Sequence, residues 1–241
     1  MRIAVISDIH GNLNAFRAVL ADIDAQGADG IVCLGDTVGY GPEPEECLQL
    51  VRERGISMVL GNHEQALADP RWLHGFNPHA REALLHTATF LSSESMDFIR
   101  SLPRHLTIDD ARFVHGLPPD SPEVYLFQAD DARLREVMER LPQRWCFVGH
   151  THDLELVWLD GKSIRRSSLL PGLNPIVPTM RYIINVGSVG QPRDGDNRAK
   201  YVLWERKAHT VELRRMAYDF KDTARKIIER GFDKRYAERL Y

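Results

Sequence analysis

The sequence predicts an α/β protein, because its first half alternates short apolar runs with segments of helical periodicity. Residues 2–7, 30–34 and 57–60 are apolar runs of strand length. Residues 13–25 and 44–54, which lie between these runs, carry apolar side chains at helical spacing. Crossover helices of this length imply a parallel sheet that is covered on its faces.

The remainder of the chain adds a helical insert and then a β-rich half. Residues 69–101 follow a helical pattern, are rich in His and Ala and carry no strand signal, so we expect a helical insert, with a lid over a cleft as one role for it. We further expect helices at 129–140 and 219–230 and a short or frayed helix at 234–241. The expected strands are 105–108, 111–115, 145–148, 154–159, 181–186, 201–205 and 210–216. No linker separates two parts, so we expect a single domain over residues 1–241.

Composition excludes several classes of protein. Apolar residues make up 43% of the 241 and charged residues 27%, as in an ordinary soluble globular protein. The formal net charge is −3, so there is no basic field that would indicate nucleic acid as the main partner. No apolar run is long enough to cross a bilayer, and the sequence opens with a strand pattern in place of a signal peptide. Cys33, Cys47 and Cys146 form no paired framework, so we expect a cytoplasmic protein without disulfides.

Polar side chains that suit a metal ion follow the ends of the predicted strands. Asp8 and His10 follow the first strand at positions i and i+2, and Asp36 follows the second. His150 and His152 stand at the same spacing after the strand at 145–148, so in extended backbone both reach into one volume. Other strands are followed in the same way by Asn62, His63 and His115. The carboxyl ends of strands border the binding crevice of an open α/β sheet, so we expect these residues to converge.

The number and type of these side chains predict two metal ions. With His63 set aside, two carboxylates, one amide oxygen and four imidazoles are too many for one tetrahedral zinc site. They suit two ions of higher coordination number that share one carboxylate, an arrangement typical of phosphatases and nucleases. Mixed nitrogen and oxygen ligation without thiolate fits Mn²⁺, which we expect first, and also Fe, Zn²⁺, Ni²⁺ or Co²⁺.

Five short motifs in a fixed order resemble those of the calcineurin-like metallophosphoesterases. They are D-x-H at 8–10, G-D at 35–36, G-N-H-E at 61–64, H-G at 115–116 and G-H-T-H at 149–152. The stretch 185–193 resembles the N-x-G-S-x-x-x-P-R loop of the small bacterial and archaeal phosphodiesterase branch of this family. The resemblance implies an α/β fold in which two mixed β-sheets, flanked by helices, form a four-layer α/β/β/α sandwich.

The resemblance also implies roles for the individual residues. One metal ion would be held by Asp8, His10, Asp36 and His152. The other would be held by Asp36, Asn62, His115 and His150. Asp36 would bridge the two ions and take part in catalysis, with a hydroxide between the ions as nucleophile. His63 would be the second catalytic residue, which protonates the leaving oxygen, and Glu64 would accept a hydrogen bond that orients a histidine.

Three further residues are candidates for contact with a substrate. Arg193 suits a phosphate because a guanidinium pairs with it in bidentate geometry, although a solvated loop arginine is an equal alternative. Asn12 is as easily the N-cap of the helix at 13–25. Tyr40 stands where protein phosphatases and symmetrical diadenosine tetraphosphate hydrolases of the family have an arginine, which weakens a close assignment to either. Tyr40 would hydrogen-bond a phosphate or stack on a base.

These motifs predict a metal-dependent enzyme that hydrolyses phosphodiesters, small phosphate esters or nucleotides. Diadenosine polyphosphates and phosphoproteins are alternative substrates of the same site. A metal-binding scaffold for protein contacts is an alternative of another class, although such members of the family typically lack several ligands or the G-N-H histidine. A nuclease would carry the same motifs, but the chain has no evident basic groove with interleaved aromatic residues. We expect no membrane partner, and a homo-oligomer stays open.

Overall fold

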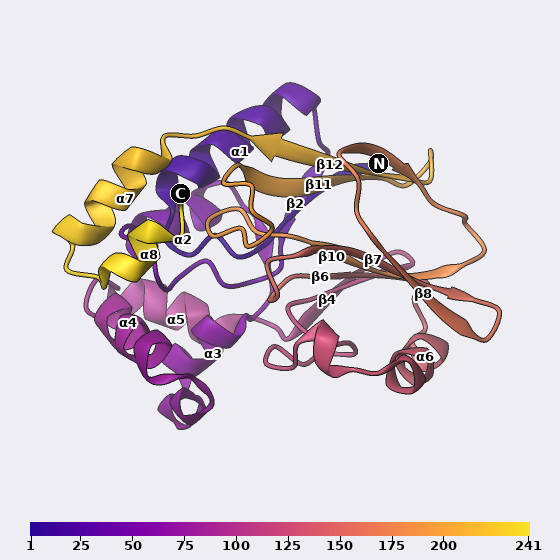
Figure 1. Ribbon diagram of the computed structural model, residues 1–241, viewed down its shortest axis with the longest axis horizontal. Coiled ribbons are helices and arrows are strands. Elements are labelled where there is room, and N and C mark those ends of the chain that lie inside the picture. The colour runs from indigo at the N-terminus through magenta and orange to yellow at the C-terminus, as the bar shows by residue number, and fades with distance from the viewer.

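The computed structural model describes residues 1–241, which form two six-stranded mixed β-sheets (Figure 1). In the first sheet, which we call sheet A, the strands are ordered β3-β2-β1-β11-β12-β9. Their bounds are β1 Arg2–Ile6, β2 Gly30–Cys33, β3 Ser57–Met58, β9 Gly172–Pro175, β11 Ala199–Glu205 and β12 Thr210–Met216. In the second sheet, sheet B, the order is β4-β5-β6-β10-β7-β8. Their bounds are β4 His105–Ile108, β5 Ala111–Val114, β6 Trp145–Val148, β7 Leu154–Asp160, β8 Ser163–Ser168 and β10 Arg181–Val186.

Each sheet contains three parallel strands, which lie at one edge of sheet A and in the interior of sheet B, and antiparallel strands complete it. In sheet A, β1 pairs in parallel with β2 and β2 with β3, as the alternation of strands and helices predicted. β11 then pairs with β1 in antiparallel orientation. In sheet B, β6 lies in parallel between β5 and β10, and the outer strands are antiparallel. Within sheet A, β1, β2 and β3 therefore end in the same direction at residues of the metal-binding motifs, and within sheet B so do β5 and β6.

The two sheets pack face to face around an apolar core. This core contains 18 buried residues from both sheets. Its centre is aromatic: the ring centroids of Phe113 and Phe147 on sheet B lie 5.2 Å apart, and Trp204 of sheet A lies 5.4 Å from Phe147. Aromatic pairs at this spacing add packing energy beyond their buried area. The aromatic contacts thus fix how the strands of the two sheets face each other.

Helices cover both outer faces, so that the molecule has four layers. Helices α1 (Leu13–Gln26) and α2 (Pro44–Glu53) cover sheet A, and α6 (Asp131–Arg140) covers sheet B (Figure 1). The side chains of α1 that are buried recur at helical spacing: Leu13, Ala15, Phe16, Val19, Leu20 and Ile23. The prediction of an α/β/β/α sandwich is confirmed.

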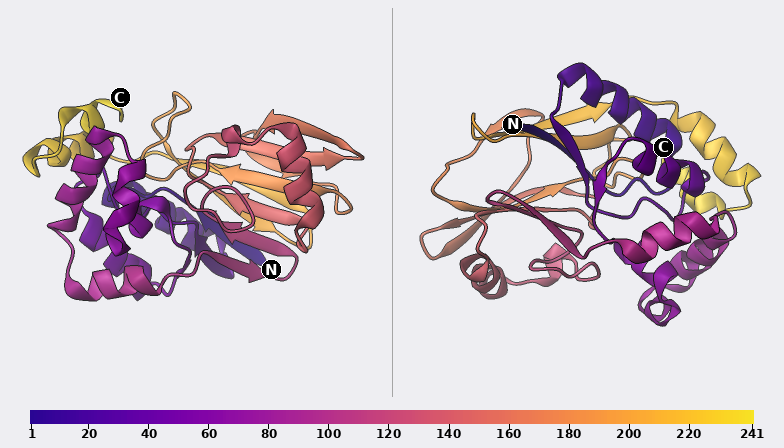
Figure 2. Two further views of the ribbon diagram at one scale, coloured as in Figure 1. Left: turned by 90° about the horizontal axis from the view of Figure 1, so that it is seen from below. Right: turned by 180° about the vertical axis from the view of Figure 1, so that it is seen from behind.

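Further helices gather at one end of the sandwich (Figure 2). They are α3 (Asn62–Ala68), the 3₁₀ helix η1 (Pro70–Gly75), α4 (Pro78–Ala88), α5 (Ser93–Ser101), α7 (Phe220–Glu229) and α8 (Lys234–Glu238). A second 3₁₀ turn, η2 (Leu126–Gln128), precedes α6. The helical segment begins at Asn62 and not at residue 69, because Glu64 folds back on the amide of Gly61 and closes the first turn of α3. The last residues are not frayed, since Tyr236 and Leu240 are buried against α4 and α7.

Two strands, β8 and β9, have no counterpart among the expected strands. β8 carries Ser or Arg at five of its six positions and owes its extended form to pairing with β7. β9 contains Gly, Leu, Asn and Pro and owes its extended form to pairing with β12.

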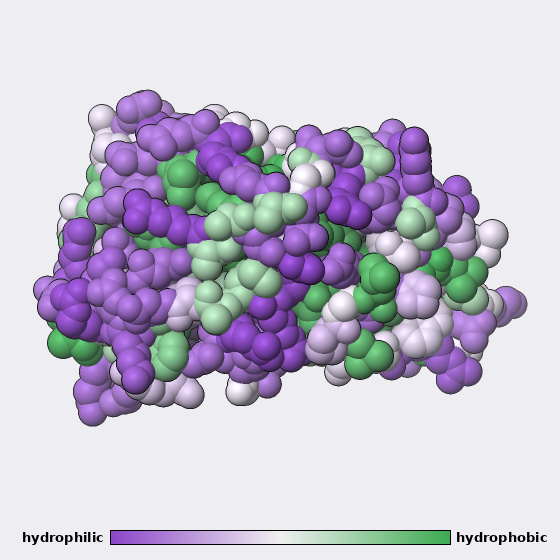
Figure 3. Space-filling model, turned by 90° about the horizontal axis from the view of Figure 1, so that it is seen from above, coloured by the Kyte–Doolittle hydropathy of each residue, from purple (hydrophilic) through white to green (hydrophobic).

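All three cysteines are free and buried. Figure 3 shows a mainly hydrophilic face on which apolar residues occur in small groups. None of the helices has the length and apolar character that a membrane span requires.

Candidate metal centre

The sheet ends bring the predicted ligands together in the interior of the molecule. The loops after β1 and β2 are joined by backbone hydrogen bonds, from Asp8 to the carbonyl of Gly35 and from His10 to that of Asp36. Gly149 in turn bonds the carbonyl of His115. Asn62 is half-buried, and the other six predicted ligands are buried: Asp8, His10, Asp36, His115, His150 and His152. Buried carboxylates and imidazoles cost free energy unless they are paired or bind a metal ion.

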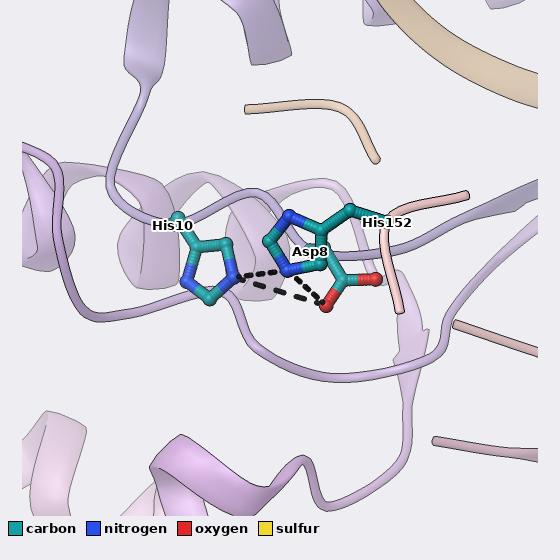
Figure 4. A group of neighbouring side chains, drawn as sticks. All are labelled: Asp8, His10 and His152. Atoms are coloured by element: carbon teal, nitrogen blue, oxygen red, sulfur yellow. Dashed lines mark hydrogen bonds and ion pairs between the residues drawn. The ribbon is translucent and has the colours of Figure 1, made fainter. Parts of the chain in front are cut away.

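The first group of converging side chains consists of Asp8, His10 and His152 (Figure 4). The Nε2 atoms of the two histidines lie 3.1 Å apart. Asp8 Oδ1 lies 3.3 Å from His152 Nε2 and 3.8 Å from His10 Nε2. Asp36 Oδ2 approaches the same His10 atom to 3.8 Å. Four potential ligands thus surround one small volume.

The second group, on the other side of Asp36, contains His115, His150 and Asn62. His115 Nε2 lies 3.3 Å from Asp36 Oδ2, 3.1 Å from His150 Nδ1 and 3.1 Å from Asn62 Oδ1. The same carboxylate oxygen of Asp36 therefore faces both groups. The structure separates His150 from His152 in the way that the resemblance implied, with one histidine in each group.

Each of the four histidines points one ring nitrogen into the centre and the other, outer nitrogen away from it. Hydrogen bonds at the outer nitrogens fix the orientation of the four rings. The other ring nitrogen of each histidine faces a backbone carbonyl, which can only accept a hydrogen bond. These carbonyls belong to Val38 for His10, Leu34 for His115, Glu123 for His150 and Gln191 for His152. Each neutral ring therefore carries its proton on the outer nitrogen and turns a lone pair inward. The lone pairs of His10 and His152 lie 3.1 Å apart and repel each other, and a cation between them removes the repulsion.

The pKa values of His10, His150 and His115 differ with the burial and the charges around each ring. Burial holds the pKa of His10 well below its usual range and lowers that of His150 to about 3, so both rings are neutral at pH 7. His115 differs: burial opposes its protonation, but the carboxylate of Asp36 outweighs burial and raises its pKa to about 9. The second group therefore attracts positive charge, which a divalent cation would supply in place of the proton.

Strained backbone marks the same residues. Eight residues other than glycine have positive φ, and six of them belong to this centre or touch it: Asp8, His10, Asp36, Tyr40, His150 and His152. Such conformations cost about 1–3 kcal/mol each and persist where the surrounding structure enforces them. Here they turn side chains away from the strand direction and into the centre. This signal is absent from the sequence because the residue types involved are not glycine.

Two glycines of the motifs allow the loops to approach each other closely. A Cβ atom on Gly149 would lie 2.0 Å from Ser7 Oγ and 2.6 Å from Asp8 Oδ2. A Cβ on Gly61 would lie 2.2 Å from Asp36 Oδ1. The absence of a side chain at these positions is therefore a steric requirement of the centre.

Glu64 supports the loop that carries Asp36. Its carboxylate accepts hydrogen bonds from four backbone amides, those of Asp36 (2.8 Å), Thr37 (2.7 Å), Val38 (3.2 Å) and Gly61 (3.2 Å). Burial and the nearby charge of Asp36 raise the pKa of Glu64, whereas these amides favour its ionised form. The expectation that Glu64 orients a histidine is wrong, since its partners are backbone groups. It holds the loop and thereby Asp36.

His63 lies beside Asp36, and with Asp36 and His10 it forms a third group of side chains close enough together to hold a metal ion. Its amide donates to Asp36 Oδ1 (2.9 Å), and its Nε2 lies 3.9 Å from Asp36 Oδ2. The rings of His10, Tyr40 and Phe76 pack around it with centroids 4.6–5.1 Å away. Nδ1 is buried and has no hydrogen-bond partner in the protein. Burial lowers the pKa of His63 to about 4.

Two cavities open beside the centre. Of the three predicted substrate contacts, Tyr40 and Arg193 line them and Asn12 does not. Their volumes are about 240 and 510 Å³, and Tyr40, Asn77 and Tyr125 line both. Arg193 lies on the larger cavity. Asn12 caps α1 by accepting from Ala15, and its amide donates to Gly190 O (2.9 Å) and Tyr218 Oη (3.1 Å). Its polar atoms are thus engaged within the protein and are not free to contact a substrate.

Some residues at the cavities were not identified from the sequence. Tyr125 stacks on His150 with ring centroids 3.7 Å apart, and Phe76 and Asn77 come from the helical insert. Arg239 follows α8 and lies on the larger cavity. None of these residues belongs to a motif or follows a strand of the sheets, so no signal in the sequence identified them.

A comparison with family models decides the family. The model described as the calcineurin-like phosphoesterase superfamily domain matches residues 1–209. The chain belongs to this superfamily. The prediction made from the five motifs is confirmed at the level of the family, and the buried His and Asp clusters are consistent with its divalent metal sites.

Relatives that cover the whole chain agree with this assignment. The uncharacterised protein MJ0912 of Methanocaldococcus jannaschii is 37% identical over 99% of this chain and 97% of its own length. A metallophosphoesterase from Sphaerobacter thermophilus, known from a crystal structure, is 38% identical with a TM-score of 0.85, covering 100% and 98% of the two chains. The hypothetical protein PH1004 of Pyrococcus horikoshii shares the fold, with a TM-score of 0.80 at 19% identity over 100% and 97%.

Proposed function

We propose that this chain is a two-metal phosphoesterase that hydrolyses phosphodiesters or small phosphate esters, including nucleotides. One observation carries the proposal. Two pairs of imidazole nitrogens face each other at 3.1 Å, and the Oδ2 atom of Asp36 lies between the pairs, 3.8 Å from His10 Nε2 and 3.3 Å from His115 Nε2. This donor set suits two cations that share a carboxylate.

The proposed ligands fall into two sets. Asp8, His10, Asp36 and His152 would hold one ion. Asp36, Asn62, His115 and His150 would hold the other. Bound cations polarise the phosphoryl group and lower the pKa of the attacking water. The mixed nitrogen and oxygen donors suit Mn²⁺ first, with Fe, Zn²⁺, Ni²⁺ and Co²⁺ as alternatives.

The remaining residues position the substrate and supply a proton. His63 is the group best placed to protonate the leaving oxygen, because it flanks Asp36 and is not needed as a ligand. It is neutral in the free protein, and the negative charge of a bound phosphate would favour its protonation. Tyr40 makes no hydrogen bond to the protein through its hydroxyl and lines both cavities, where it would contact the ester group.

The size of the cavities favours small substrates. Volumes of about 240 and 510 Å³ suit a nucleotide or a similar organic phosphate. A phosphoprotein or a nucleic acid would need a longer open surface. The full ligand set and the retained His63 also argue against a scaffold without activity.

Metal content and hydrolysis, measured together, test the proposal. The metal in the purified protein is determined by elemental analysis, removed with a chelator and replaced by Mn²⁺ or another of the candidate ions. Hydrolysis of bis-p-nitrophenyl phosphate and p-nitrophenyl phosphate is then followed. Asp36→Asn should lower both bound metal and rate, the rate by about 100-fold or more. The matched control is Asp153→Asn, at an exposed carboxylate beside His152. A protein that hydrolyses neither ester with any ion contradicts the proposal.

The role of His63 has a separate test. A residue that protonates the leaving oxygen matters most when that oxygen is strongly basic, so His63→Asn should slow phenyl phosphate by about 10²–10⁴-fold and the p-nitrophenyl ester much less. Metal content should stay that of the wild type. Equal slowing of the two esters would show that His63 acts in another way.

A further inference from the structure

Two arginines from distant parts of the chain meet at the larger cavity beside the metal centre. Arg193 comes from the loop after β10, and Arg239 follows α8 near the end of the sequence. One Nη atom of each guanidinium lies 3.4 Å from the same atom, Gln191 Oε1. Arg239 lies outside the part of the chain that the family model matches, which ends at residue 209. The shared features of the family therefore do not account for it.

The two charges have no counter-ion in the protein. Neither arginine forms an ion pair, whereas the one carboxylate side chain that lines this cavity, Asp196, is already paired with Arg198 (2.6 Å) and Arg215 (3.2 Å). Two guanidinium groups that share one neutral oxygen repel each other and keep most of their N–H donors free. An anion placed between them would remove the repulsion and use the free donors in bidentate pairs.

Packing fixes the segment that delivers Arg239. Tyr236 of α8 stacks on Tyr40 with ring centroids 4.9 Å apart, and its hydroxyl donates to the carbonyl of His79 in α4 (2.9 Å). The next turn buries Leu240. The guanidinium of Arg239 is therefore held at the rim of the cavity by a docked helix and is not at the tip of a free terminus.

Gln191 links this arginine pair to the metal centre. Its carbonyl accepts the outer N–H of His152, and its side-chain oxygen faces the two arginines. Burial raises the pKa values of Tyr40 and Tyr125. The positive charge of Arg193 acts on both in the opposite direction and lowers their pKa values. The arginine pair lines the larger cavity, Asn62 and His150 of the metal centre line the smaller one, and Tyr40 and Tyr125 line both.

We propose that Arg193 and Arg239 form an anion subsite that binds a second phosphate group of the substrate. The inference rests on the proposed function and narrows it to organic phosphates with two or more phosphate groups, such as nucleoside diphosphates or bisphosphates. Tyr40 and Tyr125 lie between the subsite and the metal centre, where they would contact the part of the substrate that joins the two phosphates.

Binding measurements test the subsite without relying on turnover. Calorimetry on the Mn²⁺-loaded protein compares AMP with two doubly phosphorylated probes, adenosine 3′,5′-bisphosphate and the methylene-bridged analogue of ADP. The wild type should bind at least one of these probes about tenfold or more tightly than AMP. In Arg193→Gln and Arg239→Gln the ratio of affinities should fall toward one. Arg235→Gln is the matched control, because Arg235 lies on α8, the helix that directly precedes Arg239, but pairs with Asp233 outside the cavity.

The two proposals fail in different ways. The subsite is refuted if neither doubly phosphorylated probe binds more tightly than AMP, or if the advantage survives in Arg239→Gln. Hydrolysis of nitrophenyl esters, followed in parallel, reports on the phosphoesterase itself. Hydrolysis without a preference for the second phosphate refutes the subsite alone, whereas the preference without any hydrolysis refutes the proposed activity and leaves the subsite supported.

Discussion

Replacement of Glu64 by glutamine should destabilise the loop that holds Asp36. Each carboxylate oxygen of Glu64 accepts two backbone amides: Oε1 from Thr37 and Val38, and Oε2 from Asp36 and Gly61. Glutamine keeps one of these oxygens and replaces the other by an NH₂ group, which cannot accept. Two buried N–H donors then lose their partner.

The size of the effect follows from these two donors. A buried donor without a partner costs about 1–3 kcal/mol, so Glu64→Gln should lower the free energy of unfolding by about 2–6 kcal/mol. This is a large part of the roughly 5–15 kcal/mol that is typical of a folded domain. Glu46→Gln is the control: Glu46 lies 3.5 Å from Arg230 with both side chains about 40% exposed, and its loss should change stability by less than about 0.5 kcal/mol.

Unfolding by guanidinium chloride at pH 7, followed by circular dichroism, measures both variants. The protein is first stripped of metal, so that the loss of a bound ion does not add to the effect, and the measurement is then repeated with Mn²⁺. If metal-free Glu64→Gln unfolds within about 1 kcal/mol of the wild type, the reasoning is refuted. Such a result would mean that the two amides do not depend on the second oxygen of Glu64 as their acceptor.

Two further changes have defined outcomes. Gly149→Ala places a Cβ 2.6 Å from Asp8 Oδ2, so it should lower the free energy of unfolding by about 1–3 kcal/mol and reduce bound metal. The control is Gly30→Ala, where no atom lies within 4 Å of the added Cβ, and it should leave metal content unchanged. Burial opposes the ionisation of Asp22, but two N–H donors of Arg214 (3.0 and 2.7 Å) hold its pKa below the usual range. The ionised carboxylate stabilises the fold above its unfolded pKa of about 3.9, and the contribution is lost as the pH falls through the folded value. Asp22→Asn should therefore cost about 1–3 kcal/mol at pH 7 and much less near pH 2 in a series of urea unfolding curves; an equal cost at both pH values would contradict this explanation.

Local patterns predicted most of the fold because each element is set by its own residues. Helix α1 is an example, since its apolar spacing and the cap at Asn12 lie within the segment itself. β9 shows the opposite case: its four residues carry no strand pattern, and it is extended only because β12 lies beside it. The early start of α3 depended on a side chain, Glu64, that the motif had suggested for another role.

The sequence by itself determined the identity of the proposed ligands and their order along the chain, because D-x-H, G-D, G-N-H-E and G-H-T-H are short and local. It also predicted that they meet, because strands that run in parallel end at one edge. The family resemblance implied how the ligands divide into two groups. The tertiary structure adds the distances that place His10 beside His152 and His115 beside His150, because these depend on contacts across both sheets and on positive φ angles at His10 and His150. The arginine pair was likewise decided by tertiary structure alone, because Arg193 and Arg239 meet through the docking of α8 and not through any pattern in their neighbours.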